Sequence, residues 1–227
     1  MHIDPGVVDG AKLMLSYSTA AGVVGYTAWL AWGMFRQARL PELVLRSMAA
    51  MCLVFCFFEV LPHYRMGVSE VHLIMGAAIF LILGAAPAAI GLALGLLLQG
   101  LLFAPADLPQ YGMNLTTLLV PLFALNALSR QMIPAGTPFG QMSYQQCLVL
   151  SAAYQGGVIA WVAFWALYGQ GVNAASLAGV AQFGSAYLPV ILIECGVCTA
   201  WLAMGRHWPG LLDSRLFGGA FNRVTQA

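Results

Sequence analysis

The sequence contains very few charged residues and no long polar segment. Only 7% of its 227 residues are charged and 61% are hydrophobic, whereas ordinary soluble domains carry roughly 25% charged residues. With a net charge of +1, the chain also lacks the basic surface of a nucleic-acid-binding protein. Long apolar runs can cross lipid only when each backbone polar group is bonded within the segment. The composition therefore predicts an all-α integral membrane protein, with residues 1–227 forming one transmembrane domain.

Several other features are missing. All five cysteines lie inside apolar runs, which argues against a disulfide framework. No G-x-x-x-x-G-K-[ST] pattern is present, so the chain does not bind ATP through that motif. No nucleophile, base and orienting group can be assembled into a catalytic set. Residues 1–11 are polar and turn-prone and lack the basic–apolar–small order of a secretory signal peptide.

Hydropathy and helix breakers predict seven transmembrane helices. The apolar run from His72 to Phe103 is too long for one span, at roughly 48 Å for 1.5 Å per residue. Proline disfavours helix before itself and cannot donate a backbone hydrogen bond, so we expect a break at Gly84–Pro87. The expected spans are 13–35, 44–61, 71–83, 88–103, 113–128, 144–168 and 186–204, with residues 179–185 adding a turn before the last span, and residues 205–227 form a tail.

The basic residues predict the orientation of these spans. With the N-terminus outside, Lys12 and Arg65 fall outside and all other basic residues fall inside. The inner positions are Arg36, Arg39, Arg46, Arg130, Arg206, Arg215 and Arg223. Merging the third and fourth spans would move Arg130 and the tail outside. The positive-inside rule therefore favours seven spans with an outer N-terminus and a cytoplasmic C-terminus.

The first two residues can form a metal chelate. The terminal amine of Met1, the backbone nitrogen of His2 and Nδ1 of His2 can all reach one cation. The amine and amide nitrogens close a five-membered ring, and the amide and imidazole nitrogens close a six-membered ring. Three such nitrogens favour a flat, square-planar site. In a membrane protein this pattern indicates a receptor or transporter for a transition metal, with the segment 1–11 binding the metal.

Three of the four histidines, His2, His63 and His72, share the outer face in this orientation, whereas His207 lies inside. His72 opens the third span and is either an interfacial residue or a fourth metal ligand, since neutral imidazole suits nickel, cobalt and copper. His63 follows the second span and is either part of a wet loop or a collecting site for the cation. The neighbouring Arg65 would repel a cation there.

Other polar residues near or within the spans leave alternatives open. Asn114, at the outer start of the fifth span, either caps a helix or orients a ligand histidine. Glu59 and Glu194 lie within spans, where ionisable groups are costly and usually functional. Either can pair with an arginine, lie near a helix end or face a polar cavity. The Cys195-x-x-Cys198 pair is more typical of helix packing than of a metal site.

The first span carries a face of small residues that includes Ala21 and Gly25. Small residues three and four apart let helix backbones approach closely. The face serves either internal packing or the docking of a partner membrane subunit.

Several motifs together resemble a known family. Met1-His2-Ile3 followed by Gly6, His72-Leu73 before Gly76, the Leu83-Gly84 break and Gly112-Met113-Asn114 are similar to the CbiM/NikM family. This family is the substrate-specific membrane subunit of energy-coupling factor (ECF) transporters for cobalt or nickel. The resemblance covers roughly the first 130 residues, and the last third matches only in hydropathy. The chain departs from the family pattern at Pro5, Val7 and Val8, where an acidic residue and an aromatic are usual.

The resemblance implies a function and a set of ligands. Met1, His2 and His72 would supply a four-nitrogen site for Co²⁺ or Ni²⁺, the transported substrate, and no cofactor is expected. ATP hydrolysis would take place on separate cytoplasmic ATPases, coupled through a transmembrane T subunit, and a small accessory membrane subunit is common. The setting would be a bacterial or archaeal cell membrane, with cobalt serving cobalamin synthesis. The alternative, a seven-helix membrane enzyme or assembly factor, would use Glu59 and Glu194.

Overall fold

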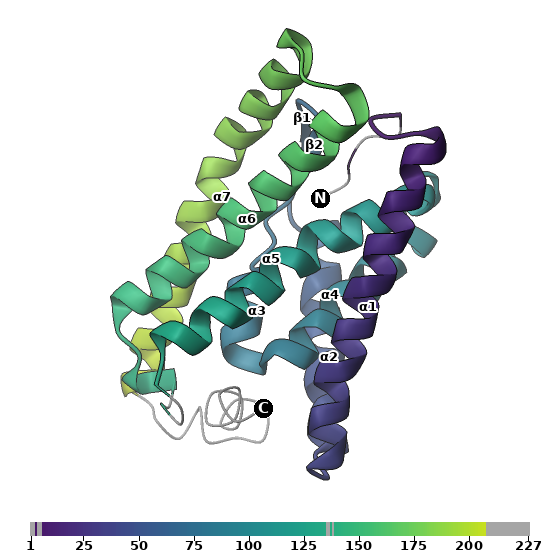
Figure 1. Cartoon of the computed structure of the whole chain (residues 1–227). Coiled ribbons are helices and arrows are strands. Elements are labelled where there is room, and N and C mark those ends of the chain that lie inside the picture. The colour runs from purple at the N-terminus through teal and green to yellow at the C-terminus, as the bar shows by residue number, and fades with distance from the viewer. Residues whose placement is uncertain (1–2, 4–5, 135–136, 138, 208–227) are drawn as a thin grey trace.

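The computed structural model describes residues 3, 6–134, 137 and 139–207. In this part of the chain, seven α-helices form a bundle with one small β-hairpin (Figure 1). The helices are α1 (Leu13–Arg36), α2 (Leu40–Glu59), α3 (Gly76–Leu83), α4 (Ala85–Leu102), α5 (Tyr111–Met132), α6 (Tyr144–Gln170) and α7 (Ala174–His207). Short 3-10 turns occur at Gly10–Lys12, Pro105–Gln110 and Phe139–Gln141. Met1, His2 and the tail from residue 208 onward lie outside the described residues.

The prediction of a helical membrane protein is confirmed. Five segments are long and apolar enough to cross a membrane, namely α2, α4, Pro105–Met132, α6 and α7. The other two helices differ from these for separate reasons. Helix α3 has 8 residues, which span only about 12 Å, and α1 includes serine, threonine and tyrosine among its 24 residues. The seven helices follow the order of the predicted spans, and the count of seven crossings stays a prediction.

The predicted break in the long apolar run is confirmed. Gly84 separates α3 from α4 and has a φ of 94°, a conformation that favours glycine. Helix α4 begins at Ala85 and not at residue 88, because Pro87 in the first turn of a helix has no intrahelical acceptor to lose.

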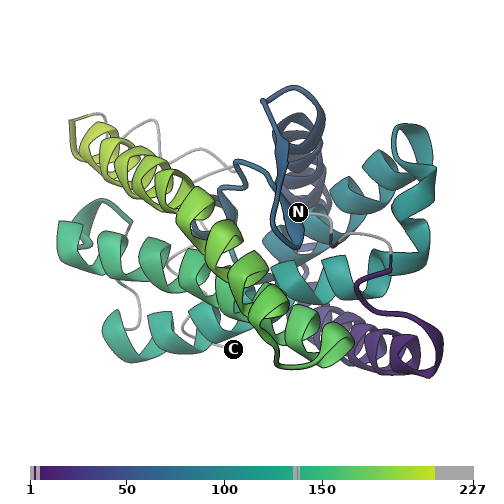
Figure 2. The same ribbon diagram turned by 90° about the horizontal axis from the view of Figure 1, so that it is seen from above.

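The predicted start of the third span is wrong. Residues Tyr64–Met66 (β1) and Ser69–Val71 (β2) form an antiparallel hairpin, with Met66 paired to Ser69 and Tyr64 paired to Val71. His72 therefore follows a strand, and α3 begins only at Gly76. The hairpin lies next to α7, and its turn rests against Gly179 of that helix (Figure 2). This contact stabilises strands of only three residues, which are too short to be stable by themselves.

The last helix is longer than predicted. Helix α7 covers 34 residues and continues through Pro189, whereas the sequence indicated 186–204 with one added turn. Proline within a membrane helix is tolerated because neighbouring groups satisfy the freed backbone carbonyl. The added N-terminal turns of α7 carry Gly179 and so provide the surface on which the hairpin packs.

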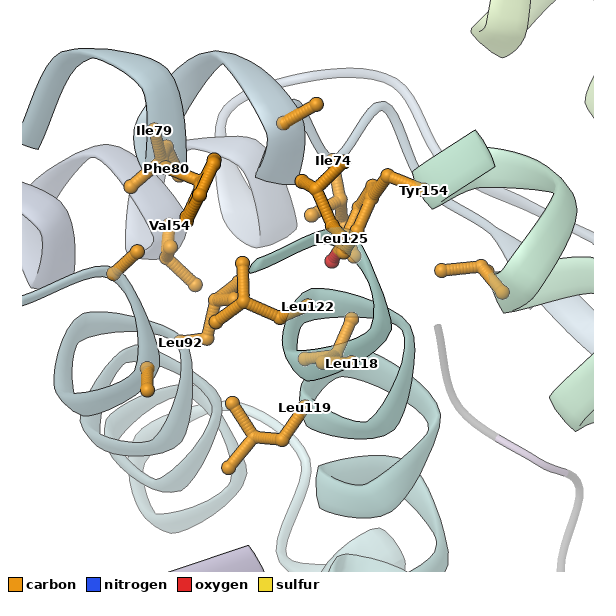
Figure 3. Close-up of a cluster of buried hydrophobic side chains, with 14 of the residues drawn as sticks. Val54, Ile74, Ile79, Phe80, Leu92, Leu118, Leu119, Leu122, Leu125 and Tyr154 are labelled. Carbon is orange, nitrogen blue, oxygen red and sulfur yellow. The ribbon is translucent and has the colours of Figure 1, made fainter. Parts of the chain in front are cut away.

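The core lies around α4 and α5, which are covered by α2, α3 and α6 (Figure 3). Leu92 of α4 and Leu118 and Leu122 of α5 are fully buried. Helix α2 packs closely on α4, where a Cβ at Gly91 would lie 2.2 Å from the Cβ of Ala50. Such small-residue contacts are typical of helices that pack within a membrane.

Candidate metal centre

The chain near its N-terminus is held inside the bundle. Ile3 is 1% exposed, and its backbone nitrogen donates a 2.9 Å hydrogen bond to Oδ1 of Asn114 in the first turn of α5. Ile3 also forms an isolated antiparallel bridge with Ser69 at the start of β2. The two contacts come from segments that are far apart in the sequence. They fix the backbone at Ile3, the residue that follows His2. They also place Ile3 beside Ser69, which precedes His72 by three residues.

The segment that follows Ile3 packs against the end of α6. Val7 and Val8 are buried, and a Cβ at Gly169 would lie 1.9 Å from the carbonyl oxygen of Val7. Lys12 Nζ donates a 2.7 Å hydrogen bond to the carbonyl oxygen of Gly169. The two valines that depart from the family pattern thus serve as apolar contacts for the N-terminal segment.

His72 is buried at the end of the hairpin, with 1% of its surface exposed. The ring of His63 stacks on it at 4.8 Å between centroids and 11° between planes. Phe58 of α2 also contacts the His72 ring, with ring centroids 5.0 Å apart and planes tilted by 60°. A buried imidazole in contact with two other rings has a restricted orientation, as a metal ligand requires.

Glu70 connects His72 with Arg65. Oε2 of Glu70 lies 3.7 Å from Nε2 of His72, and Arg65 Nε donates a 3.3 Å hydrogen bond to Oε1 of Glu70. The sequence suggested that Arg65 would repel a cation at this face. The carboxylate of Glu70 offsets that charge, although Arg65 is exposed and a surface pair of this kind contributes little.

The predicted residues do not all meet in one place. Among the described residues, no group of three or more His, Cys, Asp or Glu side chains could hold a metal ion. The structure places Ile3 against Asn114 and His63 against His72, and the strand that Ile3 bridges at Ser69 leads to His72. The predicted ligands Met1 and His2 lie outside the described residues. Asn114 does not cap α5 with its side chain, because its oxygen accepts from Ile3.

The two carboxylates proposed for the enzymatic alternative are in different surroundings. Glu59 is the last residue of α2 and is half-buried. Glu194, in the middle of α7, is fully buried and accepts hydrogen bonds from Ala77, Ala78 and Gln155. The sequence reasoning did not include Gln155, although a glutamine in the middle of an apolar helix is itself a signal of a polar contact.

The remaining predictions concern packing. Cys198 is buried, Cys195 is partly exposed, and both are free thiols. Ala21 and Gly25 lie on an exposed face of α1, and a Cβ at Gly25 would have no neighbour within 4 Å. This face is therefore not used for internal packing, the first of its two predicted uses.

Comparison with known proteins gives one match. The family model CbiM, described as the cobalt uptake substrate-specific transmembrane region, matches residues 2–205. No curated protein and no solved structure matches the chain. The match extends well past the first 130 residues on which the motif resemblance rested, and includes the last third down to residue 205. Because it covers most of the chain, the sequence belongs to the CbiM family, a transmembrane component of cobalt uptake.

Proposed function

We propose that this chain captures Co²⁺ or Ni²⁺ at the outer face of the cell membrane. It would import the ion as the substrate-binding component of an ATP-driven ECF transporter. The family supports a role in cobalt uptake as a transporter component, which disfavours the enzymatic alternative built on Glu59 and Glu194. The energy would come from separate cytoplasmic ATPases, acting through a transmembrane T subunit and with a small accessory membrane subunit. In a bacterial or archaeal cell membrane, imported cobalt would serve cobalamin synthesis.

We assign the metal ligands to the Met1 amine, the backbone nitrogen and imidazole of His2, and the imidazole of His72. The observation that carries this assignment is the anchoring of Ile3 to both Asn114 and Ser69. His2 is covalently joined to Ile3, and His72 directly follows the strand that Ile3 bridges. Four nitrogen ligands in this arrangement suit a square-planar ion such as Ni²⁺, and the same donors bind Co²⁺.

The orientation with the hairpin at the outer face has structural support. Figure 1 shows the hairpin at the end of the bundle where α1 begins and α6 ends. Arg36, Arg130 and Arg206 lie near the ends of α1, α5 and α7, where the bundle has its opposite end. Apart from Arg65 on the hairpin, the position of these arginines away from the candidate metal centre agrees with a basic cytoplasmic face.

Binding of the metal alone tests the proposal. In purified protein, we expect stoichiometric binding of Ni²⁺ and of Co²⁺, with a square-planar absorption spectrum for Ni²⁺. His2→Ala should abolish this binding because it removes the imidazole, and acetylation of the Met1 amine should abolish it because the amine nitrogen becomes an amide and is lost as a donor. His207→Ala is the matched control, since His207 ends α7 on the opposite side of the bundle. Unchanged affinity in the acetylated protein would refute the assigned ligand set.

A further inference from the structure

A fully buried carboxylate occupies the interior of the bundle, away from the charged helix ends. Glu194 has no exposed surface, and neither has Gln155 of α6 beside it. An ionisable group within a membrane span is costly unless its oxygens receive hydrogen bonds. The donors that satisfy Glu194 therefore indicate what it holds in place.

Two of these donors belong to the first turn of α3. The backbone nitrogens of Ala77 and Ala78 donate to Oε1 of Glu194 at 2.8 and 3.3 Å. The first N–H groups of a helix have no partner inside the helix and carry a partial positive charge. A serine or aspartate at position 75 would satisfy them locally, but Met75 is there and makes no side-chain cap. The cap of α3 instead comes from α7, more than one hundred positions later in the chain.

Gln155 extends this contact toward the candidate metal centre. Its Nε2 donates to Oε2 of Glu194 and to the carbonyl oxygen of Ile74, both at 2.6 Å. The backbone nitrogen of Ile74 in turn donates a 3.0 Å hydrogen bond to the carbonyl oxygen of His72. A continuous series of hydrogen bonds thus joins Glu194 to the backbone of His72.

The side chain of Tyr154, also from α6, packs against the end of the same linker. A Cβ at Gly76 would lie 2.1 Å from Cζ of Tyr154, so the ring packs directly against the backbone at the start of α3. Figure 3 shows Ile74 and Tyr154 next to each other at the edge of the core. The linker from His72 to Met75 has no regular secondary structure, and contacts from α6 and α7 hold it and the first turn of α3 in place.

We propose that Glu194 and Gln155 are positioning residues for His72, acting through the linker 72–75 and the first turn of α3. The inference rests on the proposed function, in which His72 is a metal ligand. A metal site requires its ligands to be held to within about 0.5 Å, and the supporting contacts provide that accuracy. Without Glu194 and Gln155, the linker keeps its apolar contacts but loses the hydrogen bonds that fix the backbone beside His72.

Ni²⁺ binding to the full-length protein tests the inference. Gln155→Leu should lower the Ni²⁺ affinity about tenfold, at the lower end of the losses seen for outer contacts of metal ligands, and should shift or broaden the d–d absorption. Glu194→Gln keeps one side-chain oxygen to accept from the α3 backbone but replaces the other with an NH₂ group. That NH₂ group cannot accept the hydrogen bond from Nε2 of Gln155. The variant should therefore produce the same spectral change even if Gln155→Leu fails to fold. Ser151→Ala, a buried polar change one turn away on α6, should leave both readouts unchanged.

The possible results separate the two claims. A lowered melting temperature with wild-type affinity and spectrum in both variants would overturn the positioning role, while leaving the proposed function intact. Failure of the wild-type protein to bind either Ni²⁺ or Co²⁺ would refute the proposed function and the positioning role with it. Loss of affinity in Ser151→Ala equal to that in Gln155→Leu would also overturn the inference, because the effect would then be a general response to core changes.

Discussion

The backbone nitrogen of Ile3 donates a 2.9 Å hydrogen bond to Oδ1 of Asn114, 111 positions later in the chain. Both residues are 1% exposed, so water cannot replace the bond if one partner is lost. Leaving a buried donor without a partner costs about 1–3 kcal/mol. This hydrogen bond therefore determines how firmly the N-terminal segment is seated in the bundle.

We predict that Asn114→Ala weakens Ni²⁺ binding roughly ten- to hundredfold, since each 1.4 kcal/mol corresponds to a factor of ten. The expected cause is weaker seating of the segment that carries His2. Isothermal titration of the purified protein measures the effect. Asn126→Ala is the matched control, because Asn126 is equally buried on the same helix. Equal affinities for the wild type and Asn114→Ala would show that seating of Ile3 does not limit metal capture.

A second prediction concerns the contact between the N-terminal segment and α6. In Gly169→Ala, the new methyl group would lie 1.9 Å from the carbonyl oxygen of Val7 and must push the segment away. We expect weaker Ni²⁺ binding with little change in the melting temperature of the helical bundle. In Gly156→Ala, on the same helix, the methyl group has no neighbour within 4 Å, so binding should be unchanged. A Gly169→Ala protein that binds normally would contradict the packing of Val7 on α6.

The helices could largely be predicted from the sequence, because apolar length and proline position act locally. The break at Gly84 is an example, since glycine and proline set the backbone there regardless of the rest of the fold. The hairpin at Tyr64–Val71 could not be predicted in the same way. Its strands have three residues each and depend on Ile3 and Gly179, which lie far from the hairpin in the sequence, one before it and one after it.

The candidate site was partly accessible from the sequence. His72 and Asn114 are polar residues at the ends of apolar segments, where such residues indicate function. The partner of Asn114 is the backbone nitrogen of Ile3, and a backbone group has no signature in the sequence. The hydrogen bonds of Glu194 to Ala77 and of Gln155 to Ile74 also end on backbone atoms, so the sequence gives no sign of them. Only the fold shows which backbone groups these side chains reach.

A third prediction tests whether His63 collects the cation, as one interpretation of the sequence has it, or orients His72, as their stacking indicates. Stacked rings contribute about 0.5–1.5 kcal/mol beyond their burial, and His63 stacks on His72 at 4.8 Å. If His63 only orients His72, His63→Ala should lower Ni²⁺ affinity roughly two- to tenfold, and His63→Phe should restore it. If His63 collects the cation, His63→Phe should still slow association. Stopped-flow measurement of the association rate, together with the equilibrium affinity, distinguishes these outcomes.

The last prediction concerns the exposed small-residue face of α1, defined by Ala21 and Gly25. Because a Cβ at Gly25 has no neighbour within 4 Å, Gly25→Leu should fit the isolated protein and leave Ni²⁺ affinity unchanged. If the face docks the transmembrane T subunit, the leucine should prevent close helix approach, and copurification with the coexpressed partner should be lost. Gly196→Leu is the matched control, since Gly196 is an exposed glycine on α7 with equally open surroundings. Normal copurification of Gly25→Leu would assign partner docking to a surface other than α1, and loss of copurification in Gly196→Leu would show that the effect is not specific to α1.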